Sequence, residues 1–262
     1  MALALYVEVT VEPAERLSVT SEGEGSDLPT DHTHLAARVA ASVAGHDRLA
    51  IHVRSDIPVG RGLGSSAALA VAAAAAAGAP DPLDTGAEVD GHPENAAASA
   101  LGGLVAATLV RGRAVARRLP LDPQLAFVVL VPDRVLPTTQ ARAALPAEVA
   151  HGDAAFNLGR LALLIASLAD HRDLIPEATD DRLHQGPRTP LFPESPGLLE
   201  GLVECGALAS CWSGAGPSLL AICLHETAPQ VSACGEILLS EAGVAGRAVN
   251  LQADRGGVTV GP

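Results

Sequence analysis

A glycine-rich turn at Pro58–Ser66 constrains the fold of this chain more than any other feature of its sequence. Residues 48–55 (RLAIHVRS) alternate in polarity and are partly β-branched, which predicts a strand before the turn. Residues 67–77 (AALAVAAAAAA) are strong helix formers, and the helix should end near Gly78 and Pro80. The chain therefore runs from a strand through a glycine loop into a helix.

Within this turn, Gly60, Gly62 and Gly64 alternate along the string PVGRGLGSSAA. Alternating glycines give the backbone positive φ options and remove side chains where another group must come close. Ser65 and Ser66 then stand at the helix N-terminus, where unpaired N–H groups and the helix dipole favour an anion. The turn therefore predicts a phosphate-binding loop, with a serine hydroxyl available to Mg²⁺.

Two common nucleotide-binding loops do not fit the same string. No lysine follows the last glycine, so the loop is not a Walker A motif. The third glycine comes one residue too early for G-x-G-x-x-G, and no acidic residue follows about twenty residues on in a βαβ pattern. A Rossmann-type oxidoreductase is thereby disfavoured, whereas a simple tight turn with a helix cap remains the plainest alternative.

The rest of the chain mixes helix and strand patterns, which predicts an α+β fold in two mixed layers. We expect a domain boundary near Pro132, giving domains 1–132 and 133–262. Strands are predicted at residues 3–12, 48–55, 104–110, 125–132, 207–213, 218–224 and 246–253. Helices are predicted at residues 34–44, 67–77, 92–101, 154–170 (as a long buried helix), 195–206 and 228–243.

Composition excludes several classes of function. With 17 Lys+Arg against 30 Asp+Glu the net charge is -13, which repels nucleic acids and anionic membranes. The four cysteines show no C-x-x-C pair and no histidine pair at zinc spacing, so we expect buried, reduced thiols. The N-terminus has no basic stretch followed by an apolar one, as a signal peptide would. These features predict a cytoplasmic enzyme, and they leave its oligomeric state open, including a homodimer.

The glycine turn PVGRGLGSSAA resembles the second motif of the GHMP kinases, and SGAGPS at 213–218 resembles their third motif. EVDGHPENAAASALGGLV at 88–105 resembles the E-G-H-P-D-N segment of the homoserine kinase family, and the similarity continues in order through 138–146, 154–164 and 180–188. The resemblance implies a GHMP kinase fold, with a ribosomal-S5-like N-terminal domain and a ferredoxin-like C-terminal domain. It also implies transfer of the ATP γ-phosphoryl group to the hydroxyl of L-homoserine, in threonine biosynthesis.

The resemblance also assigns residues to ATP and to the metal ion. Ser66 and Asp90 are the expected Mg²⁺ ligands, with Glu88 as the alternative; Asp90 stands where the family has glutamate. The triphosphate would be held by the turn and the start of its helix. The residues implied in ATP binding are Pro58, Gly60, Arg61, Gly62, Leu63, Gly64, Ser65, Ser66 and Ala67.

For the substrate, the resemblance places Arg142 and Arg188 on the homoserine carboxylate, which a planar guanidinium can grip through two parallel hydrogen bonds. Glu94 replaces the aspartate of the family motif, so selectivity could differ. The implied substrate-binding residues are His92, Glu94, Asn95, Thr138, Arg142, Arg188 and Gly214. No residue matches a general base, so none is assigned.

Family members begin with a motif resembling P-A-S-S-A-N-L-G-P-G-F-D, and MALALY at the start of this sequence matches the residues that follow it. We therefore expect the edge strand and the substrate contacts of that motif to be missing. Two alternatives to a homoserine kinase stay open: another GHMP kinase acting on a different small alcohol, and a nucleotide-binding homologue with impaired catalysis.

Overall fold

The computed structural model describes residues 1–261, which form two compact units. Unit 1 comprises Met1–Val59, Gly64–Leu119 and the segment from Ala253 onward. Unit 2 comprises Gly60–Leu63 and Pro120–Gln252. The chain therefore enters unit 2 briefly within the glycine turn before it returns there for the second half.

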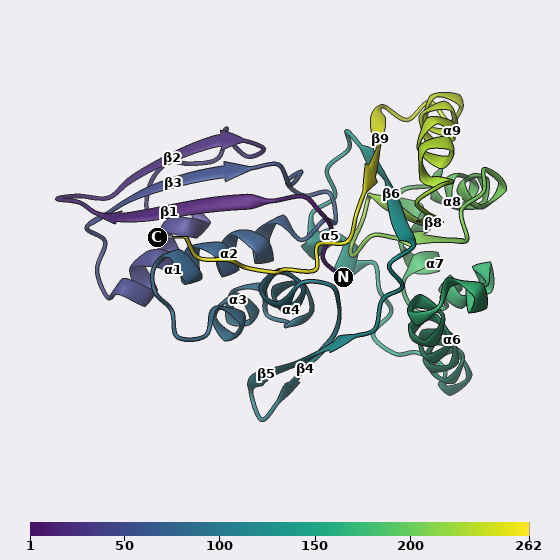
Figure 1. Ribbon diagram of the computed structural model, residues 1–262, viewed down its shortest axis with the longest axis horizontal. Helices are drawn as coiled ribbons and strands as arrows, with labels where there is room; N and C mark the ends of the chain where they lie inside the picture. The colour runs from purple at the N-terminus through teal and green to yellow at the C-terminus, as the bar shows by residue number, and fades with distance from the viewer. Residues whose placement is uncertain (262) are drawn as a thin grey trace. The chain divides into compact units, whose positions relative to one another are not determined.

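Unit 1 is built on a three-stranded sheet with β3 in the middle, antiparallel to β1 and parallel to β2. Helices α1 and α2 cover one face of this sheet (Figure 1), and alternate residues of β3 point into that core. The elements of unit 1 are β1 (Val7–Pro13), β2 (Ser18–Gly23), α1 (Leu35–Ala44), β3 (Leu49–Ser55), α2 (Ser65–Ala76), α3 (Pro82–Asp90), α4 (Glu94–Leu101), β4 (Leu104–Val110) and β5 (Arg113–Leu119).

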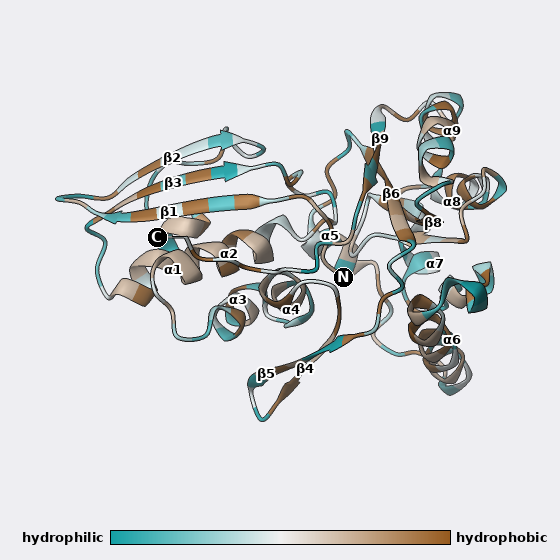
Figure 2. Ribbon diagram, in the orientation of Figure 1, coloured by the Kyte–Doolittle hydropathy of each residue, from teal (hydrophilic) through white to brown (hydrophobic). Residues whose placement is uncertain are grey.

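Helix α2 is the central helix of unit 1. Its sequence is apolar all round, as the pale brown ribbon in Figure 2 shows, and such a helix needs cover on several sides. It packs against β1, α1, α3 and α4. The small alanine side chains allow these close approaches, which fixes the position of the helix N-terminus that follows the glycine turn.

The segment from Ala253 onward belongs to unit 1, although it is far in the sequence from the other residues of that unit. Leu3 forms an isolated β-bridge with Ala253, and the Gly103 N–H donates to the Asp254 carbonyl at 2.6 Å. The Val258 N–H donates to the carbonyl of Ala100, at the end of α4, at 3.3 Å. In Figure 1 this segment is the yellow trace running beside α4 and α2.

Unit 2 contains a four-stranded antiparallel sheet in the order β7-β8-β6-β9, with α8 and α9 packed against it (Figure 1). The edge-to-face rings of Phe192 and Trp212, with centroids 6.2 Å apart, lie in its core. The elements are β6 (Leu125–Pro132), α5 (Thr138–Ala143), α6 (His151–Ala169), η1 (His171–Asp173), η2 (Pro176–Thr179), α7 (Gln185–Arg188), η3 (Thr189–Leu191), α8 (Ser195–Glu204), β7 (Ala209–Trp212), β8 (Leu219–Leu224), α9 (Ala228–Glu241) and β9 (Gly246–Leu251).

The division into units differs from the expected domains 1–132 and 133–262. Strand β6 is buried along its whole length and pairs with both β8 and β9, so it belongs to the second unit rather than to the end of the first. The boundary therefore falls at Leu119–Pro120. The return of the chain from Ala253 to unit 1 was also not expected, because nothing in the local sequence pattern signals it.

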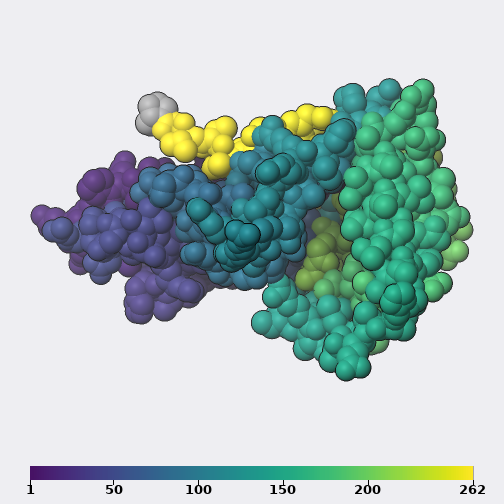
Figure 3. Space-filling model, turned by 90° about the horizontal axis from the view of Figure 1, so that it is seen from below, coloured from purple at the N-terminus to yellow at the C-terminus, as the bar shows by residue number. Residues whose placement is uncertain are grey.

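Helix α6 forms where a helix was predicted, but the expectation that it is buried is wrong. Only Ser167 and Leu168 are buried, and Leu158 is 68% exposed. Figure 3 shows green residues of this part of unit 2 at the molecular surface. By length and composition α6 is the one helix within residues 1–261 that could cross a membrane, which is weak support for a span. Helix α6 is therefore a surface helix of unit 2, and it packs against η1 and η2.

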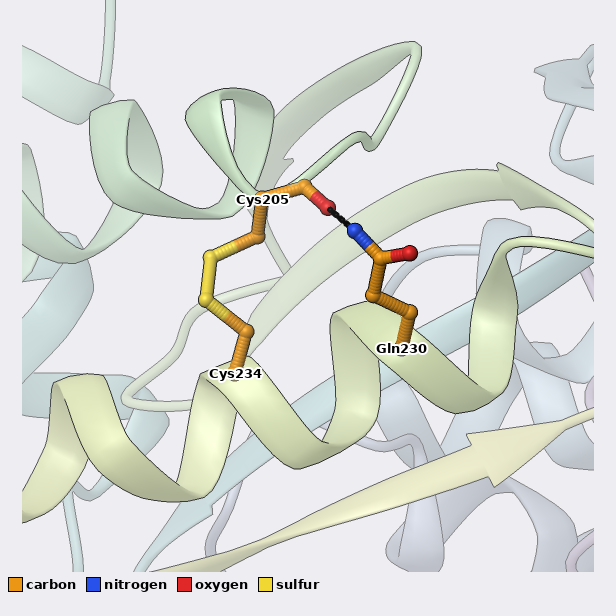
Figure 4. Close-up of a disulfide and its surroundings, with 3 residues drawn as sticks. All are labelled: Cys205, Gln230 and Cys234. Carbon is orange, nitrogen blue, oxygen red and sulfur yellow. Dashed lines mark hydrogen bonds between the residues drawn. A yellow bond between two sulfur atoms is a disulfide. The ribbon is translucent and has the colours of Figure 1, made fainter.

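The expectation of four reduced thiols is wrong for two of the cysteines. Cys205, after α8, and Cys234, on α9, form a disulfide with a Cα–Cα distance of 6.2 Å (Figure 4). The side-chain amide of Gln230 also donates to the Cys205 carbonyl at 3.2 Å. Cys211 and Cys223 are free, and burial raises the pKa of the Cys211 thiol to about 11. The bond links two neighbouring helices of unit 2.

Candidate active site

The N-terminus of α2, in unit 1, has a geometry that favours an anion. Gly64 caps the helix in the left-handed conformation, with φ of 73°, which glycine adopts without strain. No side chain within residues 1–261 caps the first turn, and no acidic residue lies in that turn. Ser66 is exposed there, whereas Ala67 is buried against the core. The free N–H groups and the helix dipole therefore favour a negatively charged ligand.

The preceding residues Gly60–Leu63 pack within unit 2, against the loop between β7 and β8. The Ser213 hydroxyl donates to the Gly62 carbonyl at 2.9 Å, and the Ser218 N–H donates to the Arg61 carbonyl at 3.2 Å. These bonds join the second and third sequence motifs, because residues 213–218 are the SGAGPS segment. Within that segment, the Gly216–Pro217 peptide bond is cis.

Gly62 has the positive φ and the close neighbour inferred from the sequence, but that neighbour is the protein's own backbone. A Cβ atom at Gly62 would lie 2.3 Å from the Ser213 carbonyl oxygen and 2.7 Å from the Gly216 nitrogen. The space freed by the missing side chain is therefore filled by the protein's own backbone rather than kept for a ligand. The backbone φ of 75° adds a second requirement for glycine.

The other residues predicted for ATP vary in their surroundings. Pro58, in unit 1, is buried, and Leu63 is half-buried. The Arg61 guanidinium donates through Nη1 to the Pro132 carbonyl, within unit 2. Gly60 is left-handed, with φ of 68°. Arg61 is thus used, in this structure, to hold the loop to the end of β6.

The polar residues of the 88–105 segment gather where α3 ends and α4 begins, in unit 1. His92 lies between two carboxylates: its Nδ1 is 2.7 Å from Glu94 Oε2, and its Nε2 is 3.7 Å from Asp90 Oδ2. The side chain of Asn95 would be in ordinary van der Waals contact with a Cβ atom placed on Gly64. Glu88 is exposed and sits two residues before Asp90 on α3. The start of α2 and the His92 cluster are therefore neighbours.

These residues fit a magnesium ion by their chemistry. Mg²⁺ takes hard oxygen ligands and keeps several waters, so one carboxylate and one hydroxyl with phosphate oxygens suffice. The Asp90 side chain is 15% exposed, and its only ion pair within residues 1–261 is the 3.7 Å contact with His92. Ser66 supplies an exposed hydroxyl in the same unit. The carboxylate oxygens of Asp90 are therefore available to coordinate a metal ion.

In unit 2, the structure brings Arg188 beside Gly214 and α5. Arg188 is only 8% exposed, and it donates through Nε to the Ala141 carbonyl at 3.2 Å and through Nη1 to the Gly214 carbonyl at 3.1 Å. Thr138 begins α5, and exposed Arg142 follows Ala141 on the same helix. The buried guanidinium of Arg188 therefore lies beside Gly214 and beside α5, the helix that carries the predicted substrate residues Thr138 and Arg142.

The electrostatics of this group favour an anion. Burial lowers the pKa of Arg188, and the charge of Arg142 lowers it further, while Asp181 opposes the shift. Neither arginine forms an ion pair with a carboxylate anywhere in residues 1–261. A buried cation near a second cation is stabilised by a bound carboxylate, which could accept hydrogen bonds from the remaining N–H groups.

Asp181 and Gln185 make most of the hydrogen bonds of the segment 180–188, although the sequence predicted no role for either residue. The sequence feature that could have indicated these two residues is the polar string D-D-R-L-H-Q-G-P-R in which they stand.

A second polar group, Asp122 with Asp170 and His171, could geometrically hold a metal ion. The Asp122 carboxylate instead accepts the N–H and Nδ1 of His171, at 2.9 and 2.7 Å.

Comparison with known proteins defines the class. The family described as GHMP kinases N terminal domain matches residues 32–103, and the family described as GHMP kinases C terminal matches residues 156–235. The glycine turn leading into α2 and the two-unit α+β architecture agree with these matches. The expected GHMP kinase fold is confirmed, and with it the class of ATP-dependent small-molecule kinases.

Relatives narrow the class further. A homoserine kinase of Streptomyces coelicolor is 39% identical over 100% of this chain and 88% of its own length. A homoserine kinase of Mycolicibacterium vanbaalenii is 40% identical over 87% of this chain and 80% of its own. The solved homoserine kinase of Cytophaga hutchinsonii superposes with a TM-score of 0.80 at 23% identity, covering 95% of this chain and 86% of that one. The chain belongs to the homoserine kinase family.

Proposed function

We propose that this protein transfers the γ-phosphoryl group of ATP to the side-chain hydroxyl of L-homoserine, with Mg²⁺, to form O-phospho-L-homoserine. The observation that carries the proposal is the buried Arg188 guanidinium, which lies near Arg142 and forms no ion pair with a carboxylate within residues 1–261. An amino-acid substrate supplies that carboxylate. Threonine biosynthesis in the cytoplasm is the role that we assign to this reaction.

The nucleotide half of the proposal uses the residues Pro58–Ala67. The uncapped first turn of α2 would bind phosphate oxygens through its N–H groups, and Ser66 and Asp90 would hold the metal ion. Glu88 is the alternative ligand. Mg²⁺, when bound, neutralises phosphate charge that develops during the transfer.

In the substrate half, Arg142 and Arg188 would bind the homoserine carboxylate, with Thr138 and Gly214 beside them. His92, Glu94 and Asn95, which belong to unit 1, are the other residues that we propose for substrate binding. Glu94 is already engaged by His92 at 2.7 Å, so the pair would act as one polar group. The Asp90 and Glu94 replacements in the family motif are the positions most able to alter selectivity.

We assign no general base. Phosphoryl transfer depends on positioning and on charge neutralisation more than on covalent chemistry by the protein. The chain's own contribution is therefore to bind the triphosphate at α2, in unit 1, and to bind the substrate by its carboxylate, in unit 2.

The test is a panel of acceptors, incubated with ATP and Mg²⁺ and followed by ADP release, with the product identified by mass spectrometry. Homoserine, threonine, mevalonate and galactose form the panel. We expect homoserine-dependent turnover to exceed all others. Phosphorylation of mevalonate or a sugar without homoserine would favour another GHMP kinase, and nucleotide binding without any turnover would favour an impaired homologue.

A further inference from the structure

Asp181 is a buried carboxylate that the proposed phosphoryl transfer does not use. Its side chain is 5% exposed. Oδ2 accepts the backbone N–H groups of Leu183 at 3.1 Å, His184 at 2.6 Å and Gln185 at 2.6 Å, while Oδ1 accepts the side-chain amide of Asn157 at 2.6 Å. Burial raises the pKa of this carboxyl, but the hydrogen bonds from Gln185 and His184 outweigh burial and hold the pKa below its usual value.

These bonds order a turn that is too short to hold itself. Helix α7 has only four residues, and its N-cap, His184, supplies no side-chain acceptor. Asp181 accepts the first N–H groups in its place. Gln185 then fixes the turn on two sides, since its Nε2 donates to the Thr179 carbonyl at 3.0 Å and its Oε1 accepts the Trp212 N–H at 2.9 Å.

Arg188 is the last residue of this turn, and its N–H donates to the His184 carbonyl at 3.1 Å. Its guanidinium must reach Ala141 and Gly214 together, on α5 and on the loop after β7. Both contacts depend on where the turn starts. A shift of the turn would move a rigid, planar group that has two carbonyl partners to satisfy.

We propose that Asp181 is a positioning residue that fixes the turn carrying Arg188 and thereby sets the geometry with which Arg188 meets the substrate carboxylate. The inference rests on the proposed function, in which Arg188 binds that carboxylate. Asp181 acts through Arg188 and touches neither ATP nor the acceptor. Its loss should weaken substrate binding without slowing the transfer itself.

Asp181→Asn is the sharpest single change. The amide oxygen can replace Oδ2, but the amide nitrogen then faces the donating nitrogen of Asn157. Asn157 cannot simply rotate its amide, because its Oδ1 accepts the Arg182 N–H at 2.9 Å. We expect the KM for homoserine to rise about tenfold, with the KM for ATP and kcat changing by less than about twofold.

Two further variants separate positioning from a general loss of stability. In an Arg188→Lys background, Asp181→Asn should add less than about twofold to the KM for homoserine, because the group through which it acts is already lost. The double variant Asp181→Asn with Asn157→Asp again places a hydrogen-bond donor opposite an acceptor at this contact. It also leaves the net charge of the protein unchanged. It should recover the KM for homoserine to within about threefold of the wild type.

Asp180→Asn is the matched control. Asp180 is the adjacent residue, half-exposed and paired with Arg160 at 3.4 Å, and its substitution should change the KM for homoserine by less than about twofold. Equal effects of Asp181→Asn in the wild-type and Arg188→Lys backgrounds would overturn the positioning role while leaving homoserine kinase activity intact. A lower kcat together with a higher KM for ATP would also overturn the positioning role. Absence of homoserine turnover in the wild-type protein would instead overturn the proposed function.

Discussion

Replacing Gly62 by alanine tests whether the glycine turn is shaped by the protein's own backbone. The new Cβ would lie 2.3 Å from the Ser213 carbonyl oxygen, whereas Cβ atoms essentially never come closer than 3.0 Å. The two segments must therefore separate by at least 0.7 Å, the difference between these distances. That separation strains the Ser213 hydroxyl bond to Gly62 and the Ser218 N–H bond to Arg61.

The magnitude follows from two contributions. A non-glycine residue in the left-handed region costs about 1–2 kcal/mol. Loss of the two hydrogen bonds adds about 1–3 kcal/mol, at about 0.5–1.5 kcal/mol for each. Gly243→Ala is the matched control, because Gly243 is also in unit 2, has φ of 68° and has no atom within 4 Å of a built Cβ. Only the conformational cost applies there.

Urea unfolding followed by the fluorescence of Trp212, the single tryptophan, reports directly on unit 2. Trp212 is 4% exposed and lies against the 213–218 loop, since a Cβ at Gly216 would meet its ring at 2.5 Å. We expect Gly62→Ala to lower the free energy of unfolding by about 1–3 kcal/mol more than Gly243→Ala. Equal losses in the two variants would refute the backbone-packing explanation.

Three further predictions concern other parts of the chain. Asp90→Asn should raise the Mg²⁺ concentration for half-maximal activity at least about tenfold, and a larger effect of Glu88→Gln would transfer the ligand role to Glu88. The pKa of Asp122 is lowered to about 2 by hydrogen bonds from His171 and Gln124, so its stabilisation is present above pH 3.8 and is lost as the pH falls to about 2. The difference in urea midpoint between wild type and Asp122→Asn should therefore shrink on acidification, and a constant difference would contradict this. Reduction of Cys205–Cys234, which are separated by 29 residues, should lower the free energy of unfolding of unit 2 by about 3–4 kcal/mol in the chain-entropy account; titration of four free thiols without reductant would contradict the disulfide.

Local sequence patterns predicted the elements that carry their own signal. The alternation in residues 48–55 gave β3, the apolar run 125–132 gave the buried β6, and the alanine run gave α2. The glycine turn and the order of its neighbouring segments predicted the GHMP kinase fold and the homoserine kinase family, both of which the comparisons confirm. The roles of individual site residues remain predictions.

What could not be predicted depends on contacts between distant residues. The apolar pattern of α6 says that one face packs, but not how much of the helix is covered. Cys205 and Cys234 meet only because α8 and α9 pack side by side. The space left by Gly62 looked like room for a ligand because the 213–218 loop, which fills it, lies about 150 residues further along the chain.

The division of the chain into units also bears on how the protein is made. Residues after Ala253 hydrogen-bond to Gly103 and Ala100, so unit 1 cannot be completed until that segment has left the ribosome, after all of unit 2 has been synthesised. The N-terminal half therefore waits in an unfinished state during translation. Unit 2, apart from residues 60–63, is contiguous from Pro120 to Gln252, so it depends on no segment synthesised after it. A ribosome stalled before Ala253 would hold a nascent chain in which Leu3, Ala100 and Gly103 lack their partners from this segment.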